Sequence, residues 1–149
     1  SGMVRLNCEA LTRVTYLALP YLRRGSFIYQ IASSAGFAPQ PGFTVYAATK
    51  AYVKSFSIAL RQELSWREIK VTAVCPGPVK TEFFDRAYEQ EEMKFYKKFV
   101  MADPKKVVRK AIRDARKNKA VSVYGMTMKV TRIICKLLPG RWIAKIMGK

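Results

Sequence analysis

The chain has 149 residues, of which 50% are hydrophobic, and this is typical of a single globular domain with its own core. It contains no histidine, which excludes Ser-His-Asp and Cys-His catalysis and disfavours a zinc site. Its three cysteines, Cys8, Cys75 and Cys135, are far apart and form no C-x-x-C pair. We therefore expect reduced thiols in a cytoplasmic protein, and no metal site.

The net charge of +18 is concentrated in the last third of the chain. Residues 1–100 hold 14 lysines and arginines against 8 acidic residues, whereas residues 101–149 hold 14 against 2. Such a charge suits an anionic partner, either a nucleic acid or a membrane surface. No nucleic-acid-binding motif accompanies it, so we predict that no nucleic acid is bound. The sequence has no secretory signal and no apolar run of membrane-spanning length.

The first predicted element is a helix over residues 3–22, which ends near Pro20. Six apolar residues recur along it at three- and four-residue steps: Val4, Leu6, Leu11, Val14, Leu17 and Leu22. A short run of β-favouring residues then predicts a strand over 26–31. The strand leads into a loop of small residues and prolines, over 32–42.

A long helix is predicted next, over residues 44–66. Seven residues are expected on its buried face: Val45, Ala48, Tyr52, Phe56, Ala59, Leu60 and Leu64. A second strand, over 69–75, is stopped by Pro76-Gly77-Pro78. A strand, a long helix and a strand within about 50 residues make a βαβ unit, so the two strands should be parallel.

The last part of the chain begins with an aromatic-rich stretch over about 81–101. Asp103 and Pro104 are a helix cap and a first-turn proline, and they predict a helix that runs to about Lys117. A third strand is predicted over 120–124. The tail, 126–149, is mixed basic and apolar.

Three polar residues and the loop after the second strand are predicted to meet at one edge of this sheet. Tyr46 and Lys50 lie four residues apart on the first turns of the long helix, so their side chains can point into one cleft. Ser33 follows the first strand and Pro76-Gly77 follows the second, and ligands of open α/β sheets bind outside the carboxyl ends of strands. A Tyr/Lys pair alone is usually a solvated helix face that arises by chance. Its meaning depends on these neighbours.

Together these residues resemble the short-chain dehydrogenase/reductase family. The matching segments, in chain order, are VRLNCEALT with Asn7, GSFIYQIASSAG with Ser33, YAATK 13 residues further on, and VCPGPVKTEF. The resemblance implies an α/β fold, namely the C-terminal part of a Rossmann-type doubly wound parallel sheet. It also implies an enzyme that uses NAD or NADP to interconvert a carbonyl and an alcohol on a small-molecule substrate.

The resemblance further implies a catalytic role for four residues. Tyr46 would be the general acid/base, and Lys50 would favour its phenolate form and hold the nicotinamide ribose. Ser33 would hydrogen-bond the substrate oxygen, with Ser34 as the alternative serine. Asn7 would anchor a water next to Lys50, or it could be an ordinary polar residue in mid-helix.

The loop after the second strand is implied to contact the cofactor. Pro76, Gly77 and Val79 would let the backbone approach the nicotinamide, and Thr81 would bind its carboxamide or the phosphates. Thr81 could instead simply cap the following helix. The segment 81–101 is expected to be a substrate lid, in which Phe83 and Phe84 contact a hydrophobic substrate. Those aromatic residues could equally pack an interface or a core.

The first half of a family member is not found in this sequence. None of the 149 residues form a glycine-rich turn that would hold the cofactor diphosphate. We therefore interpret the chain as a truncated form that is inactive alone, and its preference for NAD or NADP is not readable. The helices over 3–22 and 44–66 correspond to those of the family's dimer interface, which implies a homo-oligomer.

We divide the chain into a family domain, residues 1–125, and a basic amphipathic tail, residues 126–149. Lys129, Arg132 and Lys136 fall on one face of the tail and apolar residues on the other. This pattern suits peripheral contact with an anionic membrane surface, or else the tail packs on a neighbouring subunit. A second interpretation of the whole chain is a non-catalytic oligomerisation or membrane-associated module that retains the motif residues.

Overall fold

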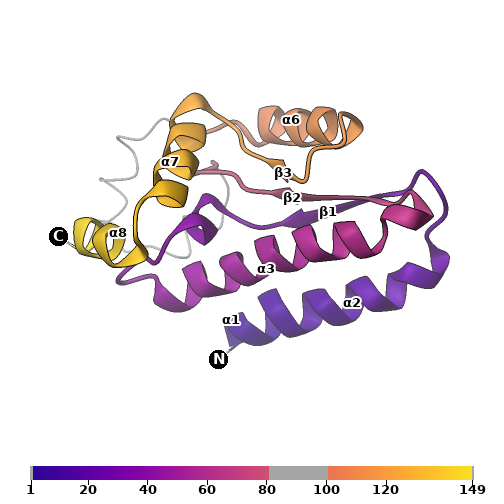
Figure 1. Ribbon diagram of the computed structural model, residues 1–149, viewed down its shortest axis with the longest axis horizontal. Coiled ribbons are helices and arrows are strands. Elements are labelled where there is room, and N and C mark those ends of the chain that lie inside the picture. Colours follow the sequence, from indigo (N-terminus) through magenta and orange to yellow (C-terminus); the bar gives the residue numbers. More distant parts are fainter. Residues whose placement is uncertain (1, 81–100, 149) are drawn as a thin grey trace.

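The computed structural model describes residues 2–80 and 101–148. Its centre is a parallel sheet in the order β1 (Phe27–Ile31), β2 (Lys70–Val74), β3 (Val121–Ser122). Figure 1 shows α3 (Thr44–Glu63) and α2 (Leu11–Ala18) on one face of this sheet and α6 (Pro104–Arg116) on the other. The predicted α/β fold with a doubly wound parallel sheet is confirmed.

The βαβ unit is formed as predicted, with α3 as the connection between β1 and β2. The two strands pair in parallel from Phe27 opposite Lys70 to Ile31 opposite Val74. β2 is the central strand, and four of its five residues are buried because helices cover it on both faces. Val71 and Ala73 pack with residues of α3, whereas Val74 packs with Val107 and Ala111 of α6.

The first predicted helix is right in extent, but it is not a single α-helix. A short α-helical start, α1 (Gly2–Val4), leads into a π-helical turn, η1 (Arg5–Ala10), then α2, and it ends in a 3₁₀ turn, η2 (Leu19–Tyr21). Within α2 the one buried residue is Thr15, and several of the apolar residues that defined the pattern are exposed. Four of the six residues of the pattern, Val4, Leu6, Val14 and Leu17, are exposed, whereas Leu11 and Leu22 pack against the core.

The prediction of which residues α3 buries is largely wrong. Leu60 is buried and so is Leu64 just past the helix, but Val45, Ala48, Tyr52 and Ala59 are exposed. The buried residues of the helix are mostly small or polar: Ala47, Thr49, Val53, Ser57 and Leu60. Small side chains let the helix lie close to the sheet, and the Ser57 hydroxyl donates to the Val53 carbonyl, so its burial leaves no unpaired group.

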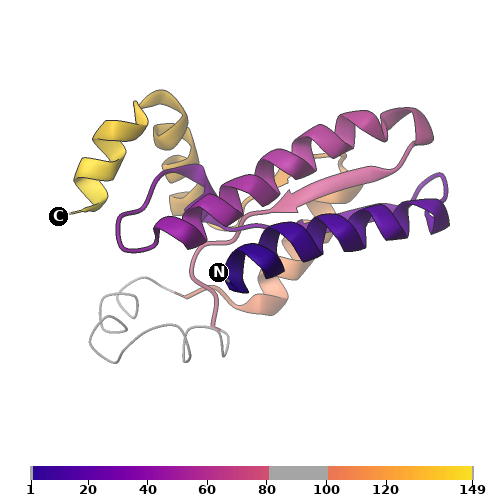
Figure 2. The ribbon, with the colours of Figure 1, turned by 90° about the horizontal axis from the view of Figure 1, so that it is seen from below.

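α2 and α3 lie side by side across the sheet, as Figure 2 shows. The Tyr16 and Phe56 rings meet edge to face with centroids 6.2 Å apart, and the Thr12 and Tyr52 hydroxyl oxygens are 2.6 Å apart. A buried polar contact joins β1 to α2, where the Gln30 amide donates to the Thr15 hydroxyl at 2.8 Å. These contacts fix the two helices against each other and against the sheet.

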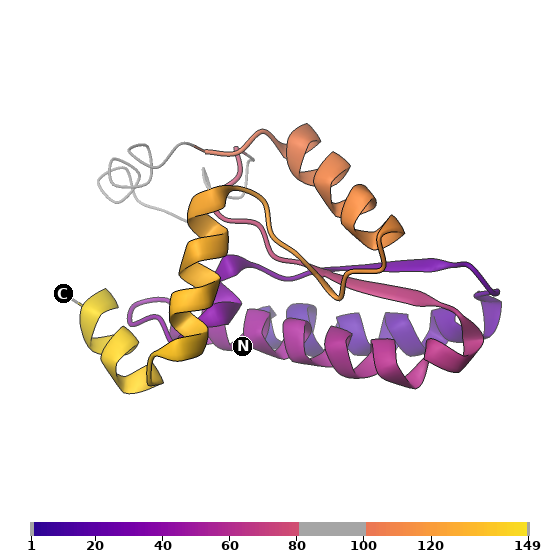
Figure 3. The same cartoon turned by 45° about the horizontal axis from the view of Figure 1, so that its top comes forward.

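The last two helices, α7 (Met126–Leu137) and α8 (Gly140–Met147), stand across the carboxyl end of the sheet (Figure 3). Met128 packs against the apolar cluster under β2, and Ile143 is buried. Leu138 and Pro139 separate the two helices. Among residues 2–80 and 101–148, no helix is long and apolar enough to cross a membrane.

α6 begins and ends at polar contacts. The Asp103 side chain caps its start by accepting from the Lys105 backbone amide at 2.8 Å, as the sequence predicts. Near its end, the buried Asp114 carboxylate accepts from the Lys110 ammonium, from the Ser122 hydroxyl at 2.9 Å and from the Lys119 ammonium at 3.0 Å. This carboxylate therefore fastens the helix to β3.

We predict that Asp114→Asn lowers the free energy of unfolding at neutral pH by about 1–3 kcal/mol, because two ammonium groups lose their anionic partner. Burial raises the pKa of Asp114, but the hydrogen bonds from Lys110, Lys119 and Ser122 outweigh burial and hold that pKa below its usual 3.8. The stabilisation is therefore complete above pH 3.8 and is lost as the pH falls through the lower, folded-state pKa.

Chemical denaturation of wild type and Asp114→Asn at a series of pH values checks this prediction. The two stabilities should converge in acid, and a difference that stays constant there would contradict an ionic origin. Asp103→Asn is the control, because asparagine is also a good N-cap and should change the stability little.

Candidate functional site

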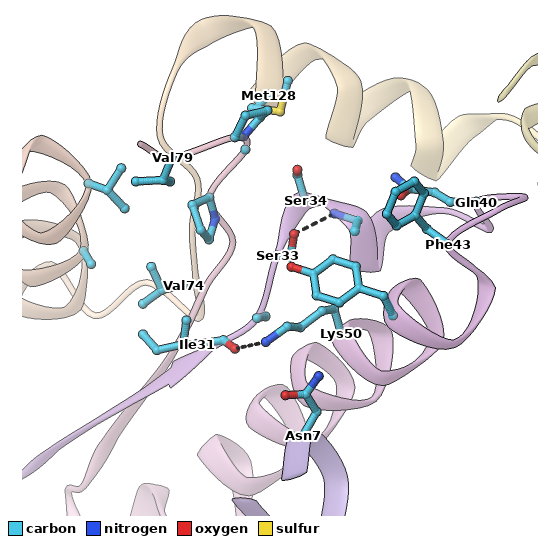
Figure 4. A pocket seen from close by; sticks show the side chains of 18 of the residues that line it. Asn7, Ile31, Ser33, Ser34, Gln40, Phe43, Lys50, Val74, Val79 and Met128 are labelled. Atoms are coloured by element: carbon cyan, nitrogen blue, oxygen red, sulfur yellow. Dashed lines mark hydrogen bonds between the residues drawn. The ribbon is translucent and has the colours of Figure 1, made fainter. Parts of the chain in front are cut away.

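A cavity of about 1160 Å³ opens at the carboxyl end of the sheet. Its walls come from the loops after β1 and β2, the first turns of α3, the α1–η1 start of the chain, the first part of α6 and the inner face of α7. Asn7, Ser33, Tyr46 and Lys50 all line it. The four residues that the family resemblance implies to be catalytic thus line one cavity. Figure 4 labels three of them: Asn7, Ser33 and Lys50.

Lys50 is the one residue with a formal charge among the described residues that line the cavity. Its ammonium donates to the Ile31 carbonyl oxygen at 3.0 Å and lies 5.8 Å from the centre of the Tyr46 ring. Burial lowers the pKa of Lys50, and the nearby Cys8 and Cys75 partly offset this effect. The cavity therefore holds a positive group, tied to the end of β1, next to a phenol.

Asn7 belongs to the π-helical turn η1, and its amide nitrogen donates to the Thr49 hydroxyl at 3.1 Å. Thr49 in turn donates to the Tyr46 carbonyl oxygen at 2.8 Å. Because Thr49 is buried and lies between Tyr46 and Lys50 in the sequence, this chain of bonds fixes the helical turn that carries both. π-helical turns are often found at functional sites.

Both candidate serines line the cavity. The Ser33 oxygen accepts from the Ala35 amide at 3.1 Å and caps the short 3₁₀ turn η3 (Ser34–Phe37). An oxygen that accepts with a lone pair keeps its O–H proton for donation. In Figure 4 the Ser33 hydroxyl lies on the Lys50 side and the Ser34 hydroxyl on the Met128 side, which favours Ser33 as the partner of Lys50 and its neighbours.

The two strand-end loops are tied together, since the Ser34 amide donates to the Pro76 carbonyl oxygen at 2.8 Å. Pro76, Gly77 and Val79 line the cavity, and Val79 forms a parallel bridge with Ala102. An added Cβ at Gly77 would lie 2.7 Å from the Met128 sulfur, so a side chain there would require the Met128 side chain to move. Thr81, Phe83, Phe84 and most of the predicted lid lie outside the described residues.

The three cysteines are free thiols, and Cys75 is fully buried. Burial raises the pKa of Cys75 to about 11, and several lysine and arginine charges act weakly in the opposite direction. Burial also raises the pKa of Cys8 and of Cys135. All three are therefore protonated at neutral pH and are poor nucleophiles.

Two sets of residues at the site were missed by the sequence interpretation. Thr49 was one, although a polar residue on the buried side of a helix is a usable signal. The other was the inner face of α7, where Met128, Thr131 and Cys135 line the cavity. Their spacing of three and four residues is that of a helix face, but the more hydrophobic residues between them dominated the pattern.

Residues 1–92 match the sequence model described as short chain dehydrogenase. The chain belongs to this family. Over 84 residues, or 54% of the chain, it is 42% identical to a sulfoacetaldehyde reductase of Chromohalobacter salexigens, of which the match covers 33%.

Solved structures of short-chain dehydrogenases match nearly the whole chain. One from Sphingobium yanoikuyae, in complex with NADPH, is 29% identical with a TM-score of 0.72; the match covers 95% of this chain and 50% of that one. A bulky-bulky ketone specific alcohol dehydrogenase from Comamonas testosteroni is 25% identical with a TM-score of 0.64, over 91% and 53% of the two chains. The chain therefore spans about half the length of these relatives.

Gly36 packs directly against the backbone of α3, the helix that carries Tyr46 and Lys50. A Cβ added there would lie 2.6 Å from the Lys50 backbone carbon and oxygen, and backbone atoms cannot turn aside. We therefore predict that Gly36→Ala destabilises the protein by about 1–3 kcal/mol, as overpacking does. Gly140→Ala is the matched control, because its Cβ would meet Pro39 at an ordinary 3.7 Å.

Thermal denaturation of both variants measures the difference. A Gly36→Ala protein as stable as wild type would show that the loop and α3 move apart freely, against the close packing that we describe.

Proposed function

We propose that this chain carries the catalytic half of a nicotinamide-dependent oxidoreductase that interconverts a carbonyl and an alcohol. The observation that supports this function best is the cavity shared by Asn7, Ser33, Tyr46 and Lys50 in a member of the short-chain dehydrogenase family. A sulfoacetaldehyde reductase and a structure in complex with NADPH are among the relatives, which favours carbonyl reduction with NADP(H).

In this proposal Tyr46 is the proton donor in reduction and the proton acceptor in oxidation. The cofactor supplies the hydride. The Ser33 hydroxyl donates to the substrate oxygen and directs it towards the phenol, where negative charge on that oxygen is neutralised by the proton of Tyr46. The Lys50 ammonium stabilises the phenolate that remains, because an opposite charge nearby favours the ionised form.

Lys50 also has the chemistry to hold the ribose hydroxyls of the nicotinamide. Its ammonium has three donors, and the Ile31 carbonyl oxygen takes one of them. The Asn7 amide nitrogen donates to the Thr49 hydroxyl. In a proton path, the water would therefore be bound by the side-chain oxygen or the backbone carbonyl oxygen of Asn7, since both can accept a hydrogen bond.

The loop after β2 fits the nicotinamide end of the cofactor. Pro76, Gly77 and Val79 would bring backbone close to the ring, and the lack of a side chain at Gly77 permits this approach. Thr81 belongs to the same proposal. The diphosphate has no glycine-rich turn to bind in this sequence, so we propose that the 149-residue chain is inactive alone.

We further propose a hydrophobic substrate. Apart from Lys50 and a few polar groups, the described lining of the cavity is apolar, and Met128, Cys135 and Met147 add polarisable sulfur atoms. The ketone named for the Comamonas testosteroni relative is bulky, which agrees with this class. Phe83 and Phe84 would cover the substrate from the segment 81–101.

The second candidate is a non-catalytic oligomerisation module. The exposed apolar residues of α2, η2 and α3 favour a homo-oligomer in either case: Val14, Leu17, Tyr21, Val45 and Tyr52. The division into a family domain, 1–125, and a basic tail, 126–149, belongs to both candidates. A functional nicotinamide site separates them, because an enzyme needs one and a module does not.

We predict that the chain binds reduced nicotinamide mononucleotide, which needs the nicotinamide and ribose contacts but no adenosine or diphosphate site. Lys50→Met should weaken this binding roughly 10- to 100-fold, which is the range of a charged hydrogen bond. Lys54→Met is the matched control, since Lys54 lies one turn further along α3 and donates to the Gly36 carbonyl oxygen instead.

Titration of nicotinamide fluorescence measures both affinities. No binding by the wild-type chain, or equal losses in the two variants, would favour the non-catalytic module.

We predict that a long-chain ketone binds this chain more tightly than a short polar ketone. Each buried methylene should contribute about threefold to fourfold in affinity. Ligand-observed NMR measures the affinities, and assays with NADH and NADPH in the same samples should show no turnover. Equal affinities would contradict the hydrophobic substrate class, and turnover would contradict the inactivity of the isolated chain.

A further inference from the structure

The outward surface of α7 and α8 is not used by the site. α7 turns Met128, Thr131 and Cys135 inwards to the cavity. A second apolar row lies on its outer side at positions i, i+3, i+4 and i+7, and its members are 46–75% exposed: Val130, Ile133, Ile134 and Leu137. A helix at the surface of a globular protein normally has one apolar face. The outer row therefore points to a contact with an apolar partner.

Basic residues run along the side of the same helix. Lys129, Arg132 and Lys136 are exposed at positions i, i+3 and i+7, and Arg141 and Lys145 continue the charge on α8. In the described part of the chain none of these five forms an ion pair. Residues 126–149 contain six lysines and arginines and no acidic residue. The surface is thus complementary to a partner that is apolar and anionic.

This surface is held in place by the body of the protein. Ile143 of α8 is 6% exposed, and the glycines at the two ends of α8 lie against the loop of Pro39 and Pro41. On the solvent side of α8, Trp142 and Ile146 are 54% and 68% exposed. The outer apolar row and its cations are therefore presented by a docked pair of helices.

We infer that the outward surface of α7 and α8 docks on an anionic lipid membrane. Helices of this kind lie in the membrane interface with aliphatic side chains and tryptophan at the acyl boundary. The long stems of lysine and arginine let their charges reach the lipid phosphates from the same helix. Docking of two copies through this surface is disfavoured, because an isologous contact would bring the same cations together.

The inference does not rest on the proposed oxidoreductase activity, and its test uses lipid binding alone. The purified chain is mixed with vesicles of phosphatidylcholine and phosphatidylserine, or of phosphatidylcholine alone, and sedimented. We expect binding to the phosphatidylserine vesicles that weakens as salt is added, and at least tenfold weaker binding to pure phosphatidylcholine.

Charge variants place the contact on the surface. Lys129→Gln with Lys136→Gln should weaken vesicle binding roughly 25-fold, since each cation near an anionic surface contributes about fivefold. Lys105→Gln with Lys106→Gln is the matched control, because it removes the same charge from exposed positions of α6. The control should reduce binding by twofold or less.

Apolar variants test the outer row. Ile133→Ser with Leu137→Ser should weaken binding at least tenfold, and both residues are exposed, so the fold should be kept. Ile58→Ser with Val108→Ser removes exposed side chains elsewhere and should leave binding unchanged. Circular dichroism of each variant checks the fold.

Three results would overturn the inference. The first is no binding to phosphatidylserine vesicles, and the second is an equal loss in the variants and their controls. The third is a change of oligomeric state in Ile133→Ser with Leu137→Ser, measured by light scattering without lipid. That result would make the surface an interface between copies of the chain.

Discussion

The position of one helical turn determines the site, and three contacts hold it. The Lys50 ammonium is bound to the end of β1, Thr49 links Asn7 to the Tyr46 backbone, and Gly36 packs directly on the Lys50 backbone. Each contact joins α3 to a different segment: a strand, the π-helical turn and the loop after β1. Within the described residues, these contacts fix the backbone of the turn that carries Tyr46 and Lys50.

The βαβ unit, the capped helix α6 and the motif residues of the cavity could be predicted from sequence because each has a local signal. The β-favouring runs define β1 and β2, and Asp103-Pro104 defines the start of α6. The π-helical turn could not be predicted, since no glycine or proline marks it. The prediction of the buried face of α3 was wrong because most residues that face the sheet are small or polar. The hydrophobic pattern therefore indicated the outward face instead.

Much apolar surface in this chain remains uncovered. On β1, Phe27, Tyr29 and Ile31 are exposed, and within the described residues β1 pairs with β2 alone. An open strand edge beside exposed aromatic residues favours pairing with another strand. The chain spans about half of the solved relatives, and its sequence holds no glycine-rich turn.

α7 connects the cavity with the outward surface. On one side its Met128 fills the space that a side chain at Gly77 would need, next to the Pro76 carbonyl that binds the Ser34 amide. On the other side it carries the exposed aliphatic row and its cations. The same helix therefore forms a wall of the cavity and carries the outward surface, so a partner that docks on the outer row would lie against the back of that wall.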